Sequence, residues 1–528
     1  MKRAAAFALI ITLLTACSPA WDMPPLVVLP GDSSGAPTPV VPDITLPDGA
    51  ASSRGFGLAW TPVDRLDPIG GRDTLNTALL PLLYDGLFVN DEAFETRPNL
   101  CASVITEDNT VFTLTLRNAV FSDGAPLQAE DVVHSLNLAR ADASPYSGRF
   151  ENVISAKAGD GTVIIELSAP KARFASLLDF PIIPASSDKE SAAPPGTGPY
   201  ILGYDGDTGQ AILTPNPFRA GHEELNPYRI ELLDARDPVN LSFYFQYRHI
   251  AAVDYDYNDP LLPGLHSGGD RFDYPTSVMQ YIGVNAALPP AESPLAWPDF
   301  RRALSMALDR ESLCEGVFGG YADPALLPVP PSSALYDAEV SAGYGFDSSA
   351  ARRILADAGC TDGDADGILE WPVSARKKVP LSFTLLVNTG NELRAAAARE
   401  WADALMPLGI ALNVSIVSWA QYTSAIESGD FDLFWAQTRL SPDFGADAFL
   451  SPDDRALSGA VLNAAADAAE AADARREVYA SLLERGNCIT ACFNRKTLLT
   501  QRGMFRAPTP AASAAFYGFT EWGITIDN

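Results

Sequence analysis

Three aspartates at alternate positions begin the segment Asp362-Gly-Asp-Ala-Asp-Gly, which is the spacing at which a calcium-binding loop starts. Carboxylate oxygens are ligands that Ca²⁺ prefers, and the glycine at the sixth position permits the sharp turn of such a loop. The twelfth position is Val373 and not the glutamate that would bind the ion with both oxygens; Glu370, at the ninth, could compensate only in part. The pattern leaves a calcium loop and an acidic exposed turn as alternatives, and we predict no metal site.

A cysteine thiol at the end of an apolar leader is the second group with a defined chemistry. The run Ala4–Leu14 follows two basic residues and is too short for a transmembrane helix, which needs ~20 residues, but it has the length of a secretory signal. Leu14-Thr15-Ala16-Cys17 resembles the bacterial lipobox, in which the thiol receives a diacylglyceryl group. We predict a signal peptide over 1–16 and lipidation of Cys17, with an ordinary signal peptide beside a chance cysteine as the alternative. The protein is then expected to be extracytoplasmic and anchored to the cell membrane.

Five further cysteines remain, an odd number that indicates at least one free thiol outside the cell. Cys488 and Cys492 stand four positions apart, and Cys314 and Cys360 flank one predicted helical region. Either pair could close a disulfide, and buried unpaired cysteines are an equal alternative.

Signatures of catalysis and of nucleic-acid binding are weak in this chain. The four histidines are widely scattered and no HExxH pair is present, so the sequence gives no indication of a zinc protease. The net charge of −29 lacks the basic footprint of a nucleic-acid binder. We therefore expect neither an enzyme nor a cofactor, and no nucleic-acid partner.

The elements that must position any site follow from hydrophobic periodicity. Residues 17–53 are rich in proline, glycine and serine and are predicted to form a flexible linker. Strict alternation predicts strands at Val111–Leu116 and Thr162–Leu167. The predicted helices are Thr74–Phe88, Glu130–Leu138, Phe300–Leu313 and Asp347–Ala358.

One stretch of the chain indicates a parallel pair of strands. Leu381–Val387 and Ala411–Ile416 alternate as strands, and the helical pattern Glu392–Leu408 lies between them, with Gly409 as its C-cap. A crossover of this length is what parallel pairing requires. The fold class is therefore predicted to be α/β, or α+β.

Several phrases, taken in order, resemble the bacterial extracellular solute-binding proteins of the dipeptide/oligopeptide/nickel family. They run along nearly the whole body of the chain. They are Leu83-Tyr-Asp-Gly-Leu-Phe88, Leu116-Arg-Asn-Ala-Val-Phe-Ser-Asp-Gly-Ala-Pro-Leu-Gln-Ala-Glu-Asp-Val-Val133, Gly196-Thr-Gly-Pro-Tyr200, Tyr281-Ile-Gly-Val-Asn285 followed by Phe300-Arg-Arg-Ala-Leu-Ser-Met-Ala-Leu-Asp-Arg310, and Trp419 followed by Phe431-Asp-Leu433.

The resemblance implies a two-lobed, periplasmic-binding-protein-like fold whose hinge consists of two crossings of the chain. Lobe I would contain 54–277 and the returning segment 496–528, and lobe II would contain 278–495. A ligand would bind in the cleft, and the lobes would close around it.

The resemblance also implies candidate ligand contacts. Asp443 is the best positional match to the aspartate that pairs with a peptide's ammonium, and Asp447 is the second choice. Trp419 would be an aromatic wall of the cleft, with core packing as the alternative. Arg439 could bind a ligand carboxylate or neutralise Asp443. Asn285 could hold the hinge strands or the ligand, and we favour the hinge.

The function that the resemblance implies is capture of a small, peptide-like ligand for an ABC importer. Permease subunits would be the protein partners, the lipid anchor would be the membrane contact, and a monomer is expected. A tethered receptor that senses peptides without transport is the alternative. A metal-chelate binder is a further alternative, although the scarcity of histidine, methionine and free cysteine disfavours a naked soft-metal site.

Overall fold

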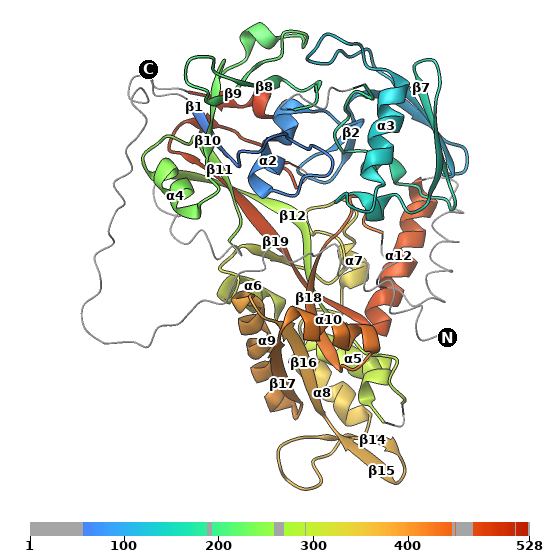
Figure 1. Cartoon of the computed structure of the whole chain (residues 1–528). Helices are drawn as coiled ribbons and strands as arrows, with labels where there is room; N and C mark the ends of the chain where they lie inside the picture. The colour runs from blue at the N-terminus through green and yellow to red at the C-terminus, as the bar shows by residue number, and fades with distance from the viewer. Residues whose placement is uncertain are drawn as a thin grey trace, which may run out of the picture.

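The computed structural model describes residues 56–186, 193–257, 269–290, 292–445, 449, 468–512 and 514–525. The predicted signal peptide, the linker, Cys17 and Asp447 lie outside these residues. Figure 1 shows two lobes, an upper one built from the N-terminal half and the C-terminal segment and a lower one built mainly from residues after 284. None of the helices in the described ranges combines the length and the apolar character of a membrane span.

One large mixed sheet extends through both lobes. Its strand order is β17-β16-β18-β12-β19-β11-β1-β10-β9-β8, and β13 pairs with β19 beside this path. The strands are β17 (Ala411–Val417), β16 (Ser382–Asn388), β18 (Leu433–Arg439), β12 (Gly269–Val284), β19 (Cys488–Gln501), β11 (Ala252–Tyr255), β1 (Phe56–Trp60), β10 (Ile230–Asp234), β9 (Ala211–Pro215), β8 (Tyr200–Tyr204) and β13 (Ala322–Pro324).

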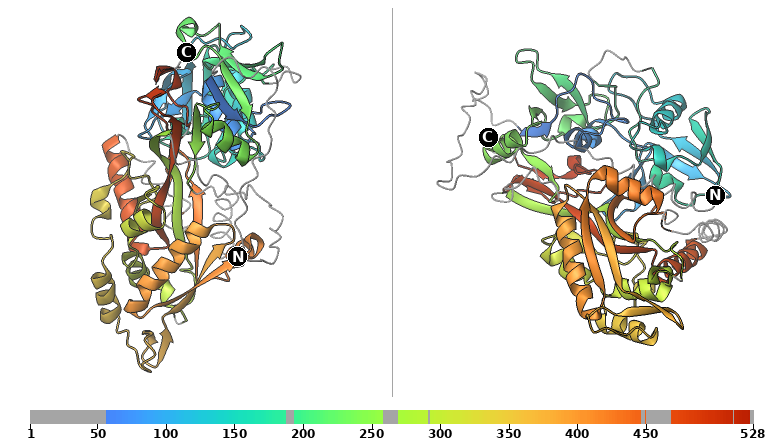
Figure 2. Two further views of the ribbon diagram at one scale, coloured as in Figure 1. Left: turned by 90° about the vertical axis from the view of Figure 1, so that its left-hand side faces the viewer. Right: turned by 60° about the horizontal axis from the view of Figure 1, so that its bottom comes forward.

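The two longest strands of this sheet, β12 and β19, connect the lobes. They pair antiparallel from Gly269 opposite Gln501 to Gly283 opposite Cys488. Both views of Figure 2 show them passing from one lobe into the other. The expected lobe boundaries, 277/278 and 495/496, fall inside these two strands, so the division into lobes at those positions stays our proposal. The predicted two-lobed α/β fold with two chain crossings is confirmed.

Lobe I adds a second, four-stranded sheet and a small hairpin to its part of the large sheet. The four-stranded sheet has the order β4-β5-β7-β6, and the hairpin is β2-β3. The elements are β2 (Phe88–Asn90), β3 (Thr96–Pro98), β4 (Cys101–Ile105), β5 (Val111–Leu116), β6 (Val153–Ala158), β7 (Thr162–Leu167), α2 (Thr74–Leu83), α3 (Ala129–Ala139), α4 (Pro238–Gln246), β20 (Phe505–Arg506) and β21 (Gly523–Ile524). The predicted strands β5 and β7 are confirmed residue for residue.

Lobe II packs its helices around the other end of the large sheet. β16 and β17 pair in parallel from Ser382 opposite Ala411 to Asn388 opposite Val417, with α9 between them in sequence, so the predicted strand–helix–strand unit is confirmed. The other elements are α5 (Pro298–Met306), α6 (Arg310–Gly316), α7 (Ala338–Ser341), α8 (Ser348–Asp357), α9 (Glu392–Leu405), α10 (Trp419–Ser428), α12 (Ala468–Arg485), β14 (Glu370–Ser374) and β15 (Lys377–Pro380).

Two predicted helices are shorter than the hydrophobic pattern indicated. The helix expected over Phe300–Leu313 is in fact two, α5 and α6, because the Asp309 carboxylate accepts a hydrogen bond from Ser312 N at 3.0 Å and starts a new helix. The helix expected over Thr74–Phe88 ends at Leu83, and Tyr84 is already extended. Gly86 then passes so close to Asp179 that a Cβ would lie 2.9 Å from the Asp179 carbonyl carbon, so only a residue without a side chain fits there.

The glycines of the Gly196–Tyr200 turn have a packing role against the end of α2. A Cβ on Gly198 would lie 2.3 Å from the Leu83 carbonyl carbon, and one on Gly196 would lie 2.0 Å from the Leu83 oxygen. Only glycine allows this approach. Two phrases that carry the family resemblance are therefore direct neighbours in space.

Neither of the two possible disulfides is formed, and all five cysteines among the described residues are free. Cys488 and Cys492 lie on the same strand, where four residues span about 13 Å, well beyond the ~7 Å Cα limit for a disulfide. Burial, followed by contact with Cys314, raises the pKa of Cys492 well above its usual range. The alternative of buried unpaired cysteines is the one that the structure supports.

Candidate ligand site between the lobes

The segment 441–445, directly after β18, contains a buried carboxylate that contacts the other lobe. Asp443 is only 9% exposed, and its Oδ2 lies 2.5 Å from Nζ of Lys171. Lys171 belongs to lobe I, four residues after β7, and is 272 positions away in the sequence. Asp443 therefore lies at the contact between the lobes, which is the region where the family resemblance placed it.

The environment of Asp443 keeps this carboxylate ionised. Burial alone would raise the pKa, but the ammonium of Lys171 and the hydroxyl of Ser441, which donates to Oδ1 at 2.5 Å, outweigh it and hold the pKa of Asp443 below its usual range. A charge-assisted hydrogen bond to a buried carboxylate is among the stronger polar contacts in proteins. The carboxylate thus binds a positively charged nitrogen, which belongs to Lys171 of the same chain.

A pair of phenylalanines forms a second contact between the lobes beside this ion pair. Phe94, from the turn between β2 and β3, meets Phe444 edge to face with ring centroids 5.3 Å apart. Phe94 is 5% exposed and belongs to an apolar cluster whose other members lie mostly in lobe II. The Phe94 ring of lobe I therefore packs into lobe II, against the residue that follows Asp443.

Both of these phenylalanines have left-handed backbone conformations. The φ angle is +61° at Phe94 and +48° at Phe444. For a bulky L-residue this region costs roughly 1–2 kcal/mol, and such strain is maintained only where the surrounding structure enforces it. Two of the six non-glycine residues with positive φ in the described part of the chain therefore meet at the contact between the lobes.

Arg173, two residues after Lys171, makes the surroundings of Asp443 predominantly positive. Its Nε and Nη2 are buried and have no hydrogen-bond partner in the described part of the chain. Burial and then the charge of Arg475 lower the pKa of Arg173, while Asp443 raises it. The Asp443 carboxylate therefore lies close to Lys171 and Arg173, and Arg475 acts on Arg173, in a protein whose overall net charge is −29.

Arg439 and Trp419 were the other two candidate ligand contacts of lobe II. Asp443 pairs with Lys171 and not with Arg439, so neutralisation of Asp443 by Arg439 is wrong. Arg439 is exposed and lies near Tyr146 of lobe I and near Tyr274, where its charge opposes the rise in pKa that burial causes in both phenols. Trp419 is half-buried and stacks on Tyr422 with centroids 5.7 Å apart. Ligand contact by either residue stays a prediction.

Asn285 supports the backbone of lobe II at the end of β12. Its Nδ2 donates to the carbonyl of Phe431 at 2.8 Å and to that of Gly429 at 3.1 Å. These contacts fix the turn between α10 and β18. Both amide hydrogens are used in this way, so a ligand could reach only the Oδ1 atom.

A cavity of about 300 Å³ lies within lobe I, beside the phrase Leu83–Phe88. Asp85 lines it and accepts hydrogen bonds from Thr197 Oγ1 at 2.9 Å and from Arg219 Nη1 at 2.6 Å. Tyr146, which lies near Arg439, is also part of its lining. The cavity is therefore lined by lobe I alone, and Tyr146 connects it to the region between the lobes.

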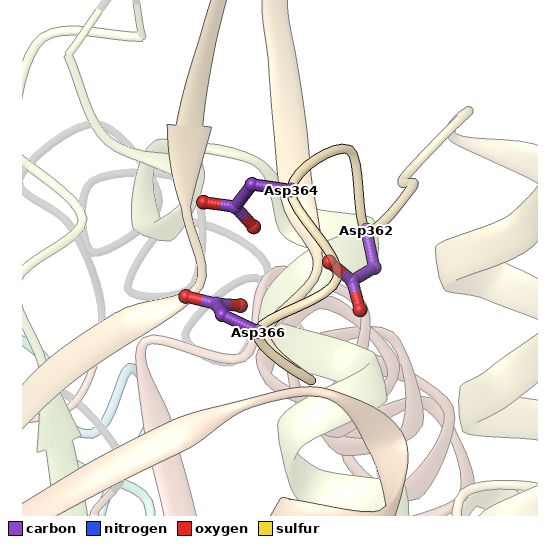
Figure 3. Close-up of side chains that lie close together, drawn as sticks. All are labelled: Asp362, Asp364 and Asp366. Carbon is purple, nitrogen blue, oxygen red and sulfur yellow. The ribbon is translucent and has the colours of Figure 1, made fainter.

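The acidic turn that could have been a calcium loop is placed at the far end of lobe II. Figure 3 shows Asp362, Asp364 and Asp366 on one turn. Each of them offers a carboxylate oxygen, and these oxygens lie within 4.8 Å of one another. All three are exposed, and Asp362 accepts backbone hydrogen bonds from Ala365 and Gly367. Glu370, which could have completed a calcium loop, lies 3.5 Å from Lys378 Nζ. These contacts are those of an acidic turn that caps itself.

Sequence reasoning missed the lobe I side of the site. Lys171, Arg173 and Phe94 lie in segments without a recognisable motif, and only folding brings them to Asp443. Sequence reasoning also gave no indication of a buried polar network that connects β12, β18 and α9. In it Gln280 donates to Gln437 at 2.8 Å, and Arg394 donates to both glutamines. Polar residues at core-facing strand positions were the available signal.

Comparison with known proteins places the chain in a family. A family description, the middle part of the bacterial extracellular solute-binding proteins of family 5, matches residues 95–456, which is more than half of the chain. Protein XP55 of Streptomyces lividans is 29% identical over 393 residues, covering 70% of this chain and 68% of that protein. The glutathione-binding protein GsiB of Salmonella typhi is 28% identical over 315 residues, covering 56% of this chain and 60% of the relative. The match to GsiB thus spans about three fifths of that relative's length.

Solved structures share the fold. The oligopeptide-binding protein AppA of Bacillus subtilis, in complex with a nonapeptide, superposes with a TM-score of 0.60 at 20% identity over 89% of this chain and 99% of that one. NikA of Brucella suis, in complex with Fe(III)-EDTA, gives a TM-score of 0.67 at 18% identity over 89% of this chain and 100% of that one. The shared fold, the ordered motifs and the matched segment agree with one another, and the chain belongs to the bacterial extracellular solute-binding proteins of family 5.

Proposed function

We propose that this protein captures a peptide-like ligand between its lobes and delivers it to an ABC importer, with Asp443 accepting the ligand's ammonium group. The observation that carries the proposal is the Asp443 carboxylate, which is buried between the lobes, ionised, and in contact with an ammonium nitrogen at 2.5 Å. A peptide N-terminus offers the same chemical group.

The relatives narrow the class of ligand to test. The similar proteins include a glutathione-binding and an oligopeptide-binding protein, and one structural neighbour, NikZ of Campylobacter jejuni, is in complex with nickel–histidine. Glutathione and peptides carry a primary ammonium and at least one carboxylate. The cationic side chain of Arg173, which interacts with Asp443, suits the ligand's carboxylate, and Asp443 suits the ammonium.

We further propose that Cys17 carries the lipid that holds the protein at the membrane, with the permease as its membrane partner. The proposal rests on the leader and on the lipobox-like Leu14–Cys17 phrase. Radiolabelled palmitate should be incorporated into the full-length protein and not into a Cys17→Ser variant. Equal labelling of the two would contradict lipidation at this residue.

The peptide proposal is tested by thermal unfolding of the purified mature protein against four probes: glutathione, trialanine, a nonapeptide and nickel–histidine. A ligand present at 100 times its dissociation constant adds ~2.7 kcal/mol of stability, a readily measured shift. We expect at least one ammonium-bearing peptide to stabilise the protein, and its N-acetylated form to do so much less.

Two outcomes would oppose the proposal. Stabilisation by nickel–histidine alone would favour a metal-chelate binder. Stabilisation by free and N-acetylated peptides to the same extent would show that the ammonium is not what the site recognises.

A further inference from the structure

Lys171 occupies the position at Asp443 that a ligand ammonium would need. Its Nζ lies 2.5 Å from Oδ2, in the same kind of charge-assisted hydrogen bond that a peptide N-terminus would make. We propose that Lys171 is a built-in substitute for the ligand's ammonium, which holds the lobes together in the ligand-free protein and must be displaced when a ligand binds. This inference rests on the proposed function and adds the residue that sets its selectivity.

The two partners of this ion pair differ in how easily they can leave it. The Asp443 side chain is 5% exposed and is held by Ser441, whereas the Lys171 side chain is 26% exposed on a flexible stem. The backbone of Lys171 is fixed, because its N–H donates to the Asn109 carbonyl at 2.8 Å. Displacement therefore needs only a rotation of the lysine side chain into solvent, while the carboxylate stays in place to receive the ligand.

The exchange gives the site a selection rule. A buried carboxylate that loses the cation of its ion pair is strongly unfavourable. A neutral or N-blocked ligand cannot replace the lysine without leaving Asp443 unpaired. A ligand with a primary ammonium exchanges one ion pair for another, and the contact between the lobes is preserved through the ligand. Lys171 therefore excludes ligands that lack a cationic nitrogen and weakens the apparent affinity of those that have one.

The test compares Lys171→Met and Lys171→Gln with the wild type, using trialanine and N-acetyl-trialanine as calorimetric probes. Removal of the competing ammonium should tighten trialanine binding by about tenfold or more. The N-acetylated probe should also bind more tightly, because it no longer has to break the Lys171–Asp443 pair, but it should stay weaker than trialanine because it leaves Asp443 unpaired. Lys171→Arg, which keeps the cation, should behave like the wild type. Lys157→Met is the matched control, because Lys157 is an exposed lysine of the same lobe and its loss changes the net charge equally.

A measurement without ligand tests whether Lys171 holds the two lobes together. The radius of gyration from small-angle X-ray scattering should increase in Lys171→Met and Lys171→Gln without ligand, and stay unchanged in Lys157→Met. An unchanged radius together with unchanged trialanine affinity would overturn the inference while leaving the peptide function intact. Weaker trialanine binding in Lys171→Met would also overturn it, because Lys171 would then be a ligand contact. If no variant binds any peptide, the proposed function itself fails, and displacement fails with it.

Discussion

Replacing Asp443 with asparagine is expected to reduce the affinity for trialanine by more than about 100-fold. The amide has the shape of the carboxylate but not its charge, and removal of one partner from a buried charge pair costs roughly 2–5 kcal/mol. A loss of about 3 kcal/mol corresponds to that factor. Isothermal titration calorimetry of the variant and the wild type would measure it.

The matched control for this substitution is Asp430→Asn, since Asp430 is an exposed aspartate of the same lobe. It should bind trialanine like the wild type. If Asp443→Asn weakened N-acetyl-trialanine as much as trialanine, the aspartate would not be the ammonium partner. The ligand-free variant should remain stable, because the freed Lys171 ammonium can turn into solvent.

The Phe94→Ala substitution is expected to cause the second large loss of trialanine affinity. The Phe94→Gly substitution should cause a smaller loss. Loss of a buried phenylalanine ring costs about 3–5 kcal/mol, and here the cost applies to the closed arrangement of the lobes. Alanine keeps the unfavourable φ of +61°, whereas glycine releases the ~1–2 kcal/mol of backbone strain and offsets its own extra chain entropy of ~0.5–1 kcal/mol. Both variants should bind trialanine more weakly, with alanine the weaker of the two.

The order of the two variants in trialanine affinity distinguishes the effect of backbone strain at residue 94 from the effect of losing the phenylalanine ring. Trialanine affinity and the radius of gyration of each variant would measure it, with Phe218→Ala as the control, because Phe218 is a phenylalanine of lobe I that is 51% exposed. Equal affinities for Phe94→Ala and wild type would mean that the Phe94–Phe444 contact does not support the closed form. Glycine weaker than alanine would mean that the left-handed φ at this position carries no strain.

Local sequence patterns were sufficient for the elements whose partners are close in the chain. The β16–α9–β17 unit, strands β5 and β7, and the helix α8 all followed from periodicity. These features depend on interactions within about thirty residues. The split between α5 and α6 was missed because the hydrophobic spacing continues across it, and only the capping of Ser312 by Asp309 interrupts the helix.

The ordered family phrases gave the scaffold and one half of the site. They indicated two lobes, two chain crossings and the segment that holds Asp443. They could not indicate what faces Asp443, because that position belongs to the other lobe and its residue lies in no family phrase.

The sequence by itself thus determined the class of fold, and it pointed to Asp443 of lobe II as the candidate acid. The export leader stays a prediction. Only the tertiary structure decided that the acid has a cation from its own chain, that two phenylalanines in left-handed conformations meet beside it, and that Asn285 serves the backbone. The physical reason is the distance along the chain between the residues that interact. Periodicity and caps are encoded by neighbours in the chain, whereas a contact between residues 171 and 443 exists only after two separately folded lobes come together.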